Sequence, residues 1–498
     1  MTKPLETDSL KLLGAALERL EGGFTHLPGE AVAADPAALA RVLDEVAARM
    51  QDNFPYFHPL YAGQMLKPPH PVARLAAALA MWVNPNNHAL DGGRASSRME
   101  KEAVAEIARM FGWEKFLGHL CGGGTMANLE ALWIAGKAKP GMTILASKQA
   151  HYTHGRISEV LGLAFEAIPC DAFGRMDMAA LEARVAKGDV GTVVATLGTT
   201  AIGSVDPLPR ILALRDRHGL RVHADAAYGG YFTLAGNLAP EARAAFDRIA
   251  EVDSIVVDPH KHGMQPYGCG CVLFRDPDVG RFYKHDSPYT YFTSTELHLG
   301  EISLECSRAG ASAVALWATQ RLFPLEEGGD FARRLARSRA AALALHRGLA
   351  SDARYVTAFP PELDIVVWAM RAPRVSEASQ LARAVFEEAA RRDLHLALAE
   401  LPVAFFDLER AGMERDRETI TCLRSVLMKP EHEAWVERIR ERLDASADTA
   451  RRQMLEARRL ALDEEIRTYP TPIPRCDAQF NHLFEERARI AKALDELR

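Results

Sequence analysis

Short apolar runs rich in β-branched residues alternate with longer amphipathic stretches through the middle of the chain. Apolar runs separated by stretches of helix length predict a mainly parallel β-sheet that helices cover on both faces. Functional groups in such α/β folds gather at the carboxyl ends of the strands. The predicted strands are residues 142–147, 191–198, 220–227, 253–258 and 269–274.

The regions on either side have different patterns. Before the predicted sheet, amphipathic helices lead into a loop rich in proline, glycine and aromatic residues. After it, the expected elements are helices over 332–350 and 376–393 and strands over 362–370 and 419–428. The predicted parts are an N-terminal helical, dimer-contact segment over 1–70, a large α/β domain over 71–335, and a small C-terminal α/β domain with a helical tail over 336–498.

The composition is typical of a globular protein of enzyme size. Of the 498 residues, 48% are hydrophobic and 25% are charged, and the 60 Lys and Arg residues are mixed with 66 Asp and Glu residues. Without a basic stripe, a signal peptide or an apolar run of about 18 residues, we expect no nucleic-acid partner, no membrane and a cytoplasmic location. The seven cysteines form no pair of CxxC motifs, so we expect reduced thiols and no metal site.

The first candidate for chemistry is a lysine in "VDPHKHGMQPYGCG", just after the predicted strand at 253–258. A partly desolvated ammonium group loses its proton readily, and the neutral amine can then form a Schiff base. A surface lysine is the more usual explanation when this stretch is taken alone. Lys261 therefore becomes a candidate nucleophile only if neighbouring motifs contribute to the same site.

Three other stretches offer groups that suit one anionic, aromatic cofactor. In "CGGGTMANLEAL" a glycine run enters a predicted helix, where a phosphate can bind the helix N-terminus. His151 can stack on a flat ring, with His154 as the less favoured alternative. Asp225 ends a predicted strand and needs a cationic partner, which a ring nitrogen would supply. Taken singly, the glycine run can be an ordinary turn, His151 a surface histidine and Asp225 the cap of a turn. Taken together with Lys261, the three stretches match the groups that bind pyridoxal phosphate.

Several motifs in the same order resemble those of the pyridoxal-phosphate-dependent group II amino-acid decarboxylases, which include glutamate, aspartate, tyrosine and aromatic L-amino-acid decarboxylases. The resemblance covers about residues 50–430, in "GGGTMANLEAL", "QAHYTHGRISEVLGL", "ATLGTTAIGSVDPL", "HADAAYGG", "DPHKHGMQPYGCGCVLF" and "ISLECSRAGASAVALW". It implies the aspartate-aminotransferase-like (type I) fold with pyridoxal 5'-phosphate as cofactor. It also implies a homodimer with active sites at the interface, and conversion of an L-amino acid to an amine and CO2 through an external aldimine and a quinonoid.

The resemblance also implies roles for individual residues. Lys261 carries the cofactor, Asp225 pairs with the ring nitrogen, His151 stacks on the ring and Ala227 packs on its other face. Further cofactor contacts are implied for Gly124, Thr125, His260 and either Thr199 or Thr200.

The proton donor is expected on the stretch "YKHDSPYTYFTSTELHLGE", residues 283–301. In the resembling family a loop tyrosine often gives the proton, and its replacement by phenylalanine is associated with oxidative deamination to an aldehyde. Tyr289 and Tyr291 are the candidates, and the sequence does not decide between them. An available tyrosine favours decarboxylation, with packing as the alternative role for both residues.

The substrate side chain is less firmly indicated. Tyr56, His58 and the neighbouring aromatic residues of "NFPYFHPLYAGQM" favour an aromatic substrate such as tyrosine or DOPA. The alternative is an acidic substrate (glutamate, aspartate or cysteate), whose second carboxylate would meet His58, Gln64, Lys67, and Arg424 or Arg308. Another pyridoxal-phosphate lyase, a desulfurase using Cys306, or an aldehyde synthase on the same scaffold remains a further alternative.

Overall fold

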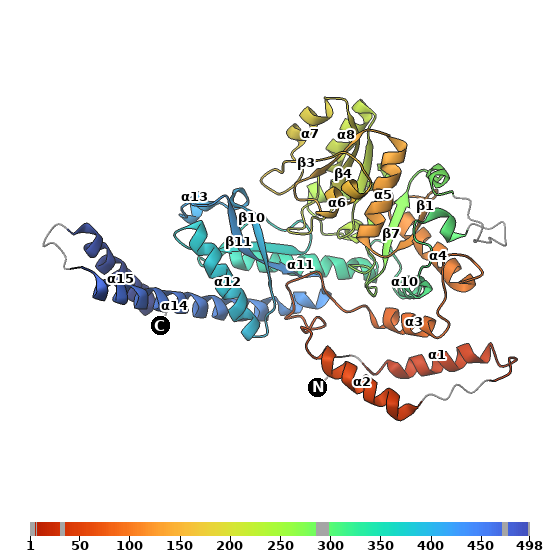
Figure 1. Cartoon of the computed structure of the whole chain (residues 1–498), viewed down its shortest axis with the longest axis horizontal. Helices are drawn as coiled ribbons and strands as arrows, with labels where there is room; N and C mark the ends of the chain where they lie inside the picture. The colour runs from red at the N-terminus through yellow and green to blue at the C-terminus, as the bar shows by residue number, and fades with distance from the viewer. Residues whose placement is uncertain (1–4, 6, 30–34, 285–297, 471–476, 497–498) are drawn as a thin grey trace.

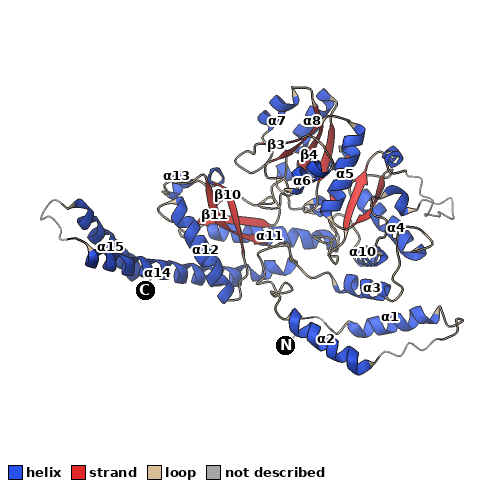
Figure 2. Ribbon diagram, viewed as in Figure 1, coloured by secondary structure: helices blue, strands red, loops and turns tan. Residues whose placement is uncertain are grey.

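Two β-sheets, each packed against helices, organise the computed structural model, which describes residues 5, 7–29, 35–284, 298–470 and 477–496 (Figure 1). The larger sheet comes from the middle of the chain and the smaller one from its C-terminal third (Figure 2). Helices that belong to neither sheet lie at both ends of the chain. The predicted α/β class is confirmed.

The larger sheet has seven strands in the order β1-β7-β6-β5-β4-β2-β3. All neighbouring pairs are parallel except the two that involve β7, which runs antiparallel to β1 and β6. The strands are β1 (Leu117–Cys121), β2 (Thr143–Ser147), β3 (Phe165–Ile168), β4 (Val190–Thr196), β5 (Arg221–Asp225), β6 (Ser254–Val257) and β7 (Gly270–Phe274).

All five strands predicted for this region are present, and β1 and β3 are additional. The pattern missed β1 because its sequence, LGHLC, places a polar histidine in the middle of the strand. It missed β3 because this strand has only four residues, lies at the sheet edge and exposes two of them. By contrast, every residue of the central strand β4 is buried, since helices cover both faces of the sheet at that point.

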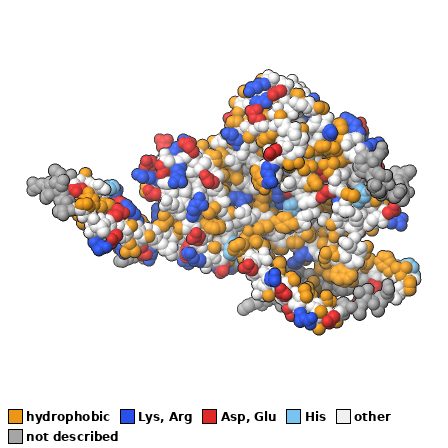
Figure 3. Space-filling model, viewed as in Figure 1, with side chains coloured by type: hydrophobic (Ala, Val, Ile, Leu, Met, Phe, Trp, Pro, Cys, Tyr) orange, Lys and Arg blue, Asp and Glu red, His pale blue; other side chains and the backbone are white. Residues whose placement is uncertain are grey.

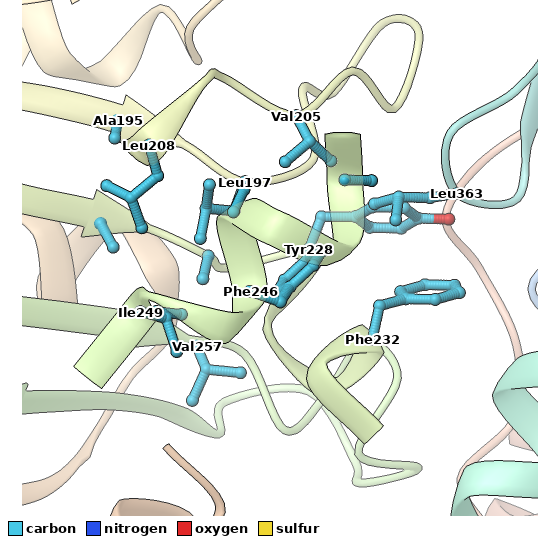
Figure 4. Packing of buried hydrophobic residues seen from close by; sticks show 14 of the residues in the cluster. Ala195, Leu197, Val205, Leu208, Tyr228, Phe232, Phe246, Ile249, Val257 and Leu363 are labelled. Atoms are coloured by element: carbon cyan, nitrogen blue, oxygen red, sulfur yellow. The ribbon is translucent and has the colours of Figure 1, made fainter. Parts of the chain in front are cut away.

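A continuous hydrophobic core lies beside the central strands. Figure 4 shows Val205, Leu208, Phe246 and Ile249 closing on the sheet, with Leu363 from the C-terminal third of the chain beside them. The helices around this sheet are α4 (Arg94–Met110), α5 (Gly124–Ala138), α6 (Thr153–Val160), α7 (Met178–Val185), α8 (Leu208–His218), α9 (Pro240–Asp247) and α10 (Gly310–Leu322). Because this core also takes in residues of the smaller sheet, the boundaries of the three predicted parts stay a prediction.

The smaller sheet is antiparallel, with four strands in the order β10-β11-β9-β8. Its strands are β8 (Tyr355–Thr357), β9 (Ile365–Met370), β10 (Ala397–Pro402) and β11 (Thr419–Val426), and its helices are α11 (Asp330–Ala350), α12 (Val375–Arg391) and α13 (Leu408–Ala411). The pattern predicted β9, β11, α11 and α12. It missed β8 and β10, which form the two edges of the sheet and are short or partly exposed.

Helices extend beyond the sheets at both termini (Figure 1). At the C-terminus α14 (Val436–Thr468) and α15 (Ala478–Glu496) pack together around a small apolar cluster. At the N-terminus α1 (Leu10–Gly22) and α2 (Pro36–Met50) contain no buried residue, whereas α3 (Pro71–Met81) packs against α10. Figure 3 shows hydrophobic side chains on the surface of this N-terminal part. None of the described helices is long and apolar enough to cross a bilayer.

Candidate active site

A cavity of about 690 Å³ opens where the carboxyl ends of β4 and β5 meet the first turn of α5 and the loop after β6. This is the edge at which parallel α/β sheets place their functional groups. Residues from all four predicted motifs line it. The predicted residues that it brings together are Gly124, Thr125, His151, Thr200, Asp225, Ala227, His260 and Lys261.

One end of the cavity is shaped for an anion by glycines. Gly123 has a φ of 138°, a conformation that side chains rarely adopt, and a Cβ at Gly124 would lie only 2.6 Å from Oδ2 of Asp258. The helix α5 begins at Gly124, so the N–H groups of its first turn lack partners within the helix. These groups and the positive end of the helix dipole favour a phosphate.

Asp225 ends β5 and is held by two hydrogen bonds. Its Oδ2 accepts a hydrogen bond from Nε2 of His154 at 2.8 Å, and its Oδ1 accepts one from the backbone N–H of Ala227 at 3.2 Å. Burial raises the pKa of Asp225, but the hydrogen bond from His154, with His223 and Lys261 nearby, outweighs burial and holds the pKa below its usual range. The carboxylate is therefore ionised when it faces the cavity.

His154 is a neighbour of the site whose contact with Asp225 the sequence pattern did not reveal. It was the less favoured candidate for ring stacking, yet its side chain is buried against Asp225. Helix α6 begins at Thr153, so His151 and His154 sit on either side of the helix start and point to different surroundings. The two histidines are three residues apart at the start of a helix that follows a strand. This spacing was the signal in the sequence that could have indicated two different roles.

Lys261 lies in the loop between β6 and β7. Its Nζ is 3.0 Å from Oδ2 of Asp258, the residue that follows β6. Nδ1 of His260 donates a hydrogen bond to the carbonyl oxygen of Cys269 at 2.8 Å, which fixes the loop on the start of β7. Tyr267, which was not predicted, lines the same cavity and packs its ring 5.0 Å from that of His260.

Two further predicted residues of the cavity are a histidine and a threonine. Nδ1 of His151 is 2.9 Å from Oγ1 of Thr153, and burial lowers the pKa of His151, so its imidazole is neutral at pH 7. Of the two threonines between which the sequence left the choice open, Thr199 is buried and accepts a hydrogen bond from the N–H of Ser204. Thr200 instead lines the cavity.

The predicted substrate residues lie elsewhere. Tyr56, His58 and Gln64 belong to the loop before α3, and among the described residues that line the cavity none comes from this loop. His58 packs edge-on against Trp435, and Gln64 accepts a hydrogen bond from Arg424. The loop still lies next to the cavity, because Arg424 also donates to the carbonyl oxygen of Thr200, and Tyr267, which lines the cavity, donates to the carbonyl oxygen of Met65. Tyr289 and Tyr291 lie outside the described residues.

The three cations considered for a second carboxylate are already engaged. Arg424 donates to the carbonyl oxygens of Gly63, Thr200 and Ala201, so its planar fork binds the protein's own backbone. Arg308 forms a buried ion pair with Glu100 at 2.7 Å. Lys67 donates to the carbonyl oxygen of Met428 at 3.4 Å, and burial lowers its pKa to about 8.

The sequence pattern of the pyridoxal-dependent decarboxylase conserved domain matches residues 55–371, which is more than half of the chain. The chain belongs to this decarboxylase family. The match contains Lys261, Asp225, His151 and the glycine run, so the resemblance seen in the motifs is confirmed.

The curated relatives of this chain differ in the substrate that their names give. An L-tyrosine decarboxylase of Enterococcus faecium is 29% identical over 392 residues, covering 58% of this chain and 64% of the relative. One from Levilactobacillus brevis is 27% identical, covering 58% and 62%. An L-aspartate decarboxylase of Thermococcus kodakarensis is 29% identical over 287 residues, covering 57% and 72%. The chain thus spans less than two thirds of the two tyrosine decarboxylases.

Solved structures of similar proteins establish the fold. The crystal structure of mouse CSAD superimposes with a TM-score of 0.72 at 21% identity, covering 87% of this chain and 91% of that one. The structure of Oryza sativa TDC with PLP and tryptamine gives a TM-score of 0.70 at 19% identity, covering 89% and 99%. The predicted type I fold of pyridoxal-phosphate enzymes is confirmed.

The cofactor of this decarboxylase family is pyridoxal 5'-phosphate, and the cavity fits it. The phosphate would lie at the glycines that begin α5, where a Cβ on Gly124 would collide with Asp258. The ionised Asp225 would pair with the ring nitrogen, and Nζ of Lys261 would attach the cofactor covalently. His151 and Ala227 also line the cavity and would be the residues that contact the ring.

Proposed function

We propose that this chain is a pyridoxal-phosphate-dependent carboxy-lyase that converts an L-amino acid to the corresponding amine and CO2. The observation that carries the proposal is that one cavity contains a lysine amine, an ionised carboxylate at a strand end and a glycine-lined helix N-terminus. Membership of the decarboxylase family supports it. An aldehyde synthase or another lyase on the same scaffold would use the same three groups, so the product is what separates them.

The bound cofactor supplies an electron-withdrawing ring that accepts the electron pair left by the departing CO2. The chain's own residues prepare this step. Asp225 stays ionised, and its negative charge would stabilise the protonated, cationic form of the cofactor's ring nitrogen. Lys261, 3.0 Å from the Asp258 carboxylate, has a partner for its ammonium form and can take up or give a proton at Nζ. Tyr289 or Tyr291 is proposed to give the proton that completes the amine.

An aromatic substrate is proposed in preference to an acidic one. No arginine is among the described residues that line the cavity, and Arg424 already donates to three backbone carbonyl oxygens and to the side chain of Gln64. The side-chain carboxylate of an acidic substrate would therefore find no arginine for a bidentate ion pair among the described residues that line the cavity. The relatives include tyrosine decarboxylases and also aspartate decarboxylases. Acidic substrates remain the second candidate for that reason.

CO2 release across a panel of amino acids tests the proposal. We expect purified protein loaded with pyridoxal 5'-phosphate to release CO2 from tyrosine or DOPA, with the amine formed in equal amount. Release from aspartate, glutamate or cysteate instead would overturn the aromatic preference alone. Formation of an aldehyde and ammonia would identify an aldehyde synthase, and no turnover of any amino acid would contradict the decarboxylase proposal.

We propose that two copies of the chain associate through the N-terminal helices. On α2 the side chains of Leu39, Val42, Leu43 and Val46 recur with helical spacing and are 49–64% exposed. An apolar stripe of this kind is costly in water and is typical of a helix that packs against a partner. We take the partner to be a second copy of the chain, because a twofold contact between two copies buries the apolar stripe of each against that of the other.

Charge placed on this stripe is expected to separate the two copies. Leu43→Asp would bury a carboxylate in the contact, so we expect sedimentation to show a single-copy mass where the unmodified protein shows two copies. Arg41→Gln is the control, because Arg41 lies on the same helix outside the apolar stripe. A two-copy mass for both variants would place the contact elsewhere, and a one-copy mass for the unmodified protein would contradict the dimer.

A further inference from the structure

A buried histidine stands behind the carboxylate of the cavity. His154 contributes no surface to the cavity, yet its Nε2 lies 2.8 Å from Oδ2 of Asp225, and both side chains are buried. The two residues are 71 positions apart, on α6 and β5. Among the described residues, His154 makes the one side-chain hydrogen bond to Asp225.

The position of the imidazole proton follows from its partners. Oδ2 of an ionised Asp225 can only accept, so Nε2 of His154 must carry a hydrogen. Nδ1 of His154 is buried and has no hydrogen-bond partner within the described part of the chain. The hydrogen on Nε2 is therefore assigned from the hydrogen-bond partner of that nitrogen.

The other titratable groups near this pair have partners of their own. His223, two residues before Asp225, hydrogen-bonds Asn128 and Ser254 at 2.8 Å each. On the cavity side, Lys261 pairs with Asp258, and His151 pairs with Thr153. Removing the imidazole of His154 would therefore leave Oδ2 of Asp225 without a replacement donor from these residues.

We propose that His154 is a positioning residue that keeps Asp225 ionised and oriented, and thereby sets the affinity of the site for pyridoxal 5'-phosphate. This inference rests on the proposed function, because it assumes that Asp225 faces the cofactor's ring nitrogen. A hydrogen bond donated to a buried carboxylate stabilises its charged form. Without that bond, Asp225 retains the hydrogen bond from the N–H of Ala227 and the nearby His223 and Lys261, but burial then favours more of the neutral form, which cannot balance a cationic ring.

The test compares His154→Leu with His154→Gln in the full-length protein. The glutamine amide can place an N–H near the position of Nε2, whereas leucine fills the space without a donor. We expect the dissociation constant of pyridoxal 5'-phosphate, measured by fluorescence titration of the apoprotein, to rise roughly 10- to 100-fold in His154→Leu. In His154→Gln it should stay within about threefold of the unmodified protein, since the bond is retained.

The pH dependence of binding separates this role from a packing role. In His154→Leu the neutral form of Asp225 gains at lower pH, so cofactor affinity should fall from about pH 8 to about pH 6 more steeply than in the unmodified protein. In His154→Gln the two profiles should coincide. Ser158→Ala is the matched control, because Ser158 is buried one turn later on the same helix and its hydroxyl has no partner among the described residues.

Each outcome decides the inference. Equal affinity in His154→Leu and the unmodified protein contradicts it, and so does an equal loss in His154→Leu, His154→Gln and Ser158→Ala, which would indicate helix packing. If His154→Leu does not fold, His154→Asn, whose shorter amide does not reach Asp225, takes its place. Adding His154→Leu to Asp225→Asn should change the affinity little, because the first residue acts through the second. If the unmodified protein does not bind the cofactor at all, the proposed function fails before the variants are compared.

Discussion

Lys261→Ala is expected to lower CO2 release by roughly a thousandfold or more, because the chain would lose both the covalent attachment of the cofactor and a proton-transfer group. Nζ of Lys261 lines the cavity beside the Asp258 carboxylate, and the other described lysines are outside the cavity lining. The visible absorbance of the lysine-linked cofactor should disappear together with the activity. Both are measured on purified protein with pyridoxal 5'-phosphate added.

The control for this prediction is Lys115→Ala, which removes an exposed lysine that is not part of the cavity lining. It should retain the activity and the absorbance of the unmodified protein. Restoration of the absorbance in Lys261→Ala by pyridoxal 5'-phosphate alone would show that another amine attaches the cofactor. Retention of activity would remove Lys261 from the reaction.

Asp225→Asn is expected to weaken binding of pyridoxal 5'-phosphate by roughly a hundredfold or more, because breaking one side of a buried charge pair leaves the other charge uncompensated. The amide has nearly the same shape, so the change tests charge rather than packing. Turnover should fall even at saturating cofactor, because the ring nitrogen would no longer be held in its cationic form. Affinity and turnover are measured separately for that reason.

Asp247→Asn provides the control, since Asp247 is an exposed carboxylate whose partner is Arg243 on α9. It is expected to leave cofactor affinity and turnover unchanged. The pKa of Asp225 lies below its usual range, so the unmodified protein should not lose cofactor affinity through this group at mildly acidic pH. A fully active Asp225→Asn variant would contradict the charge role of Asp225 in the proposed function.

Most strands of the fold were predictable because their signal is local. A run such as GTVVAT is apolar at nearly every position, which only a strand buried on both faces requires. The missed strands β1, β3, β8 and β10 flank the buried strands at sheet edges, and edge positions are short or tolerate polar residues. For such strands the pairing partner supplies the information that the strand's own sequence lacks.

The residues that meet in the cavity were predictable for a similar reason. Each of Lys261, Asp225, His151 and Gly124 ends or follows a strand or begins a helix, so their motifs carry the local geometry with them. Their meeting in one cavity follows from the parallel sheet, whose strand ends share one edge. The substrate residues carried no such local signal, and the loop with Tyr56 and His58 contributes nothing to the described lining of this chain's cavity.

The sequence by itself therefore determined the α/β class and the groups that meet in the cavity, because apolar periodicity and motif order depend on neighbouring residues. Only the tertiary structure decided which partner each polar group meets. It placed Thr200 rather than Thr199 at the cavity, engaged Arg424 with backbone carbonyl oxygens, and brought His154 to Asp225. The physical reason is that a hydrogen bond acts over about 3 Å, and long-range packing alone brings such residues that close.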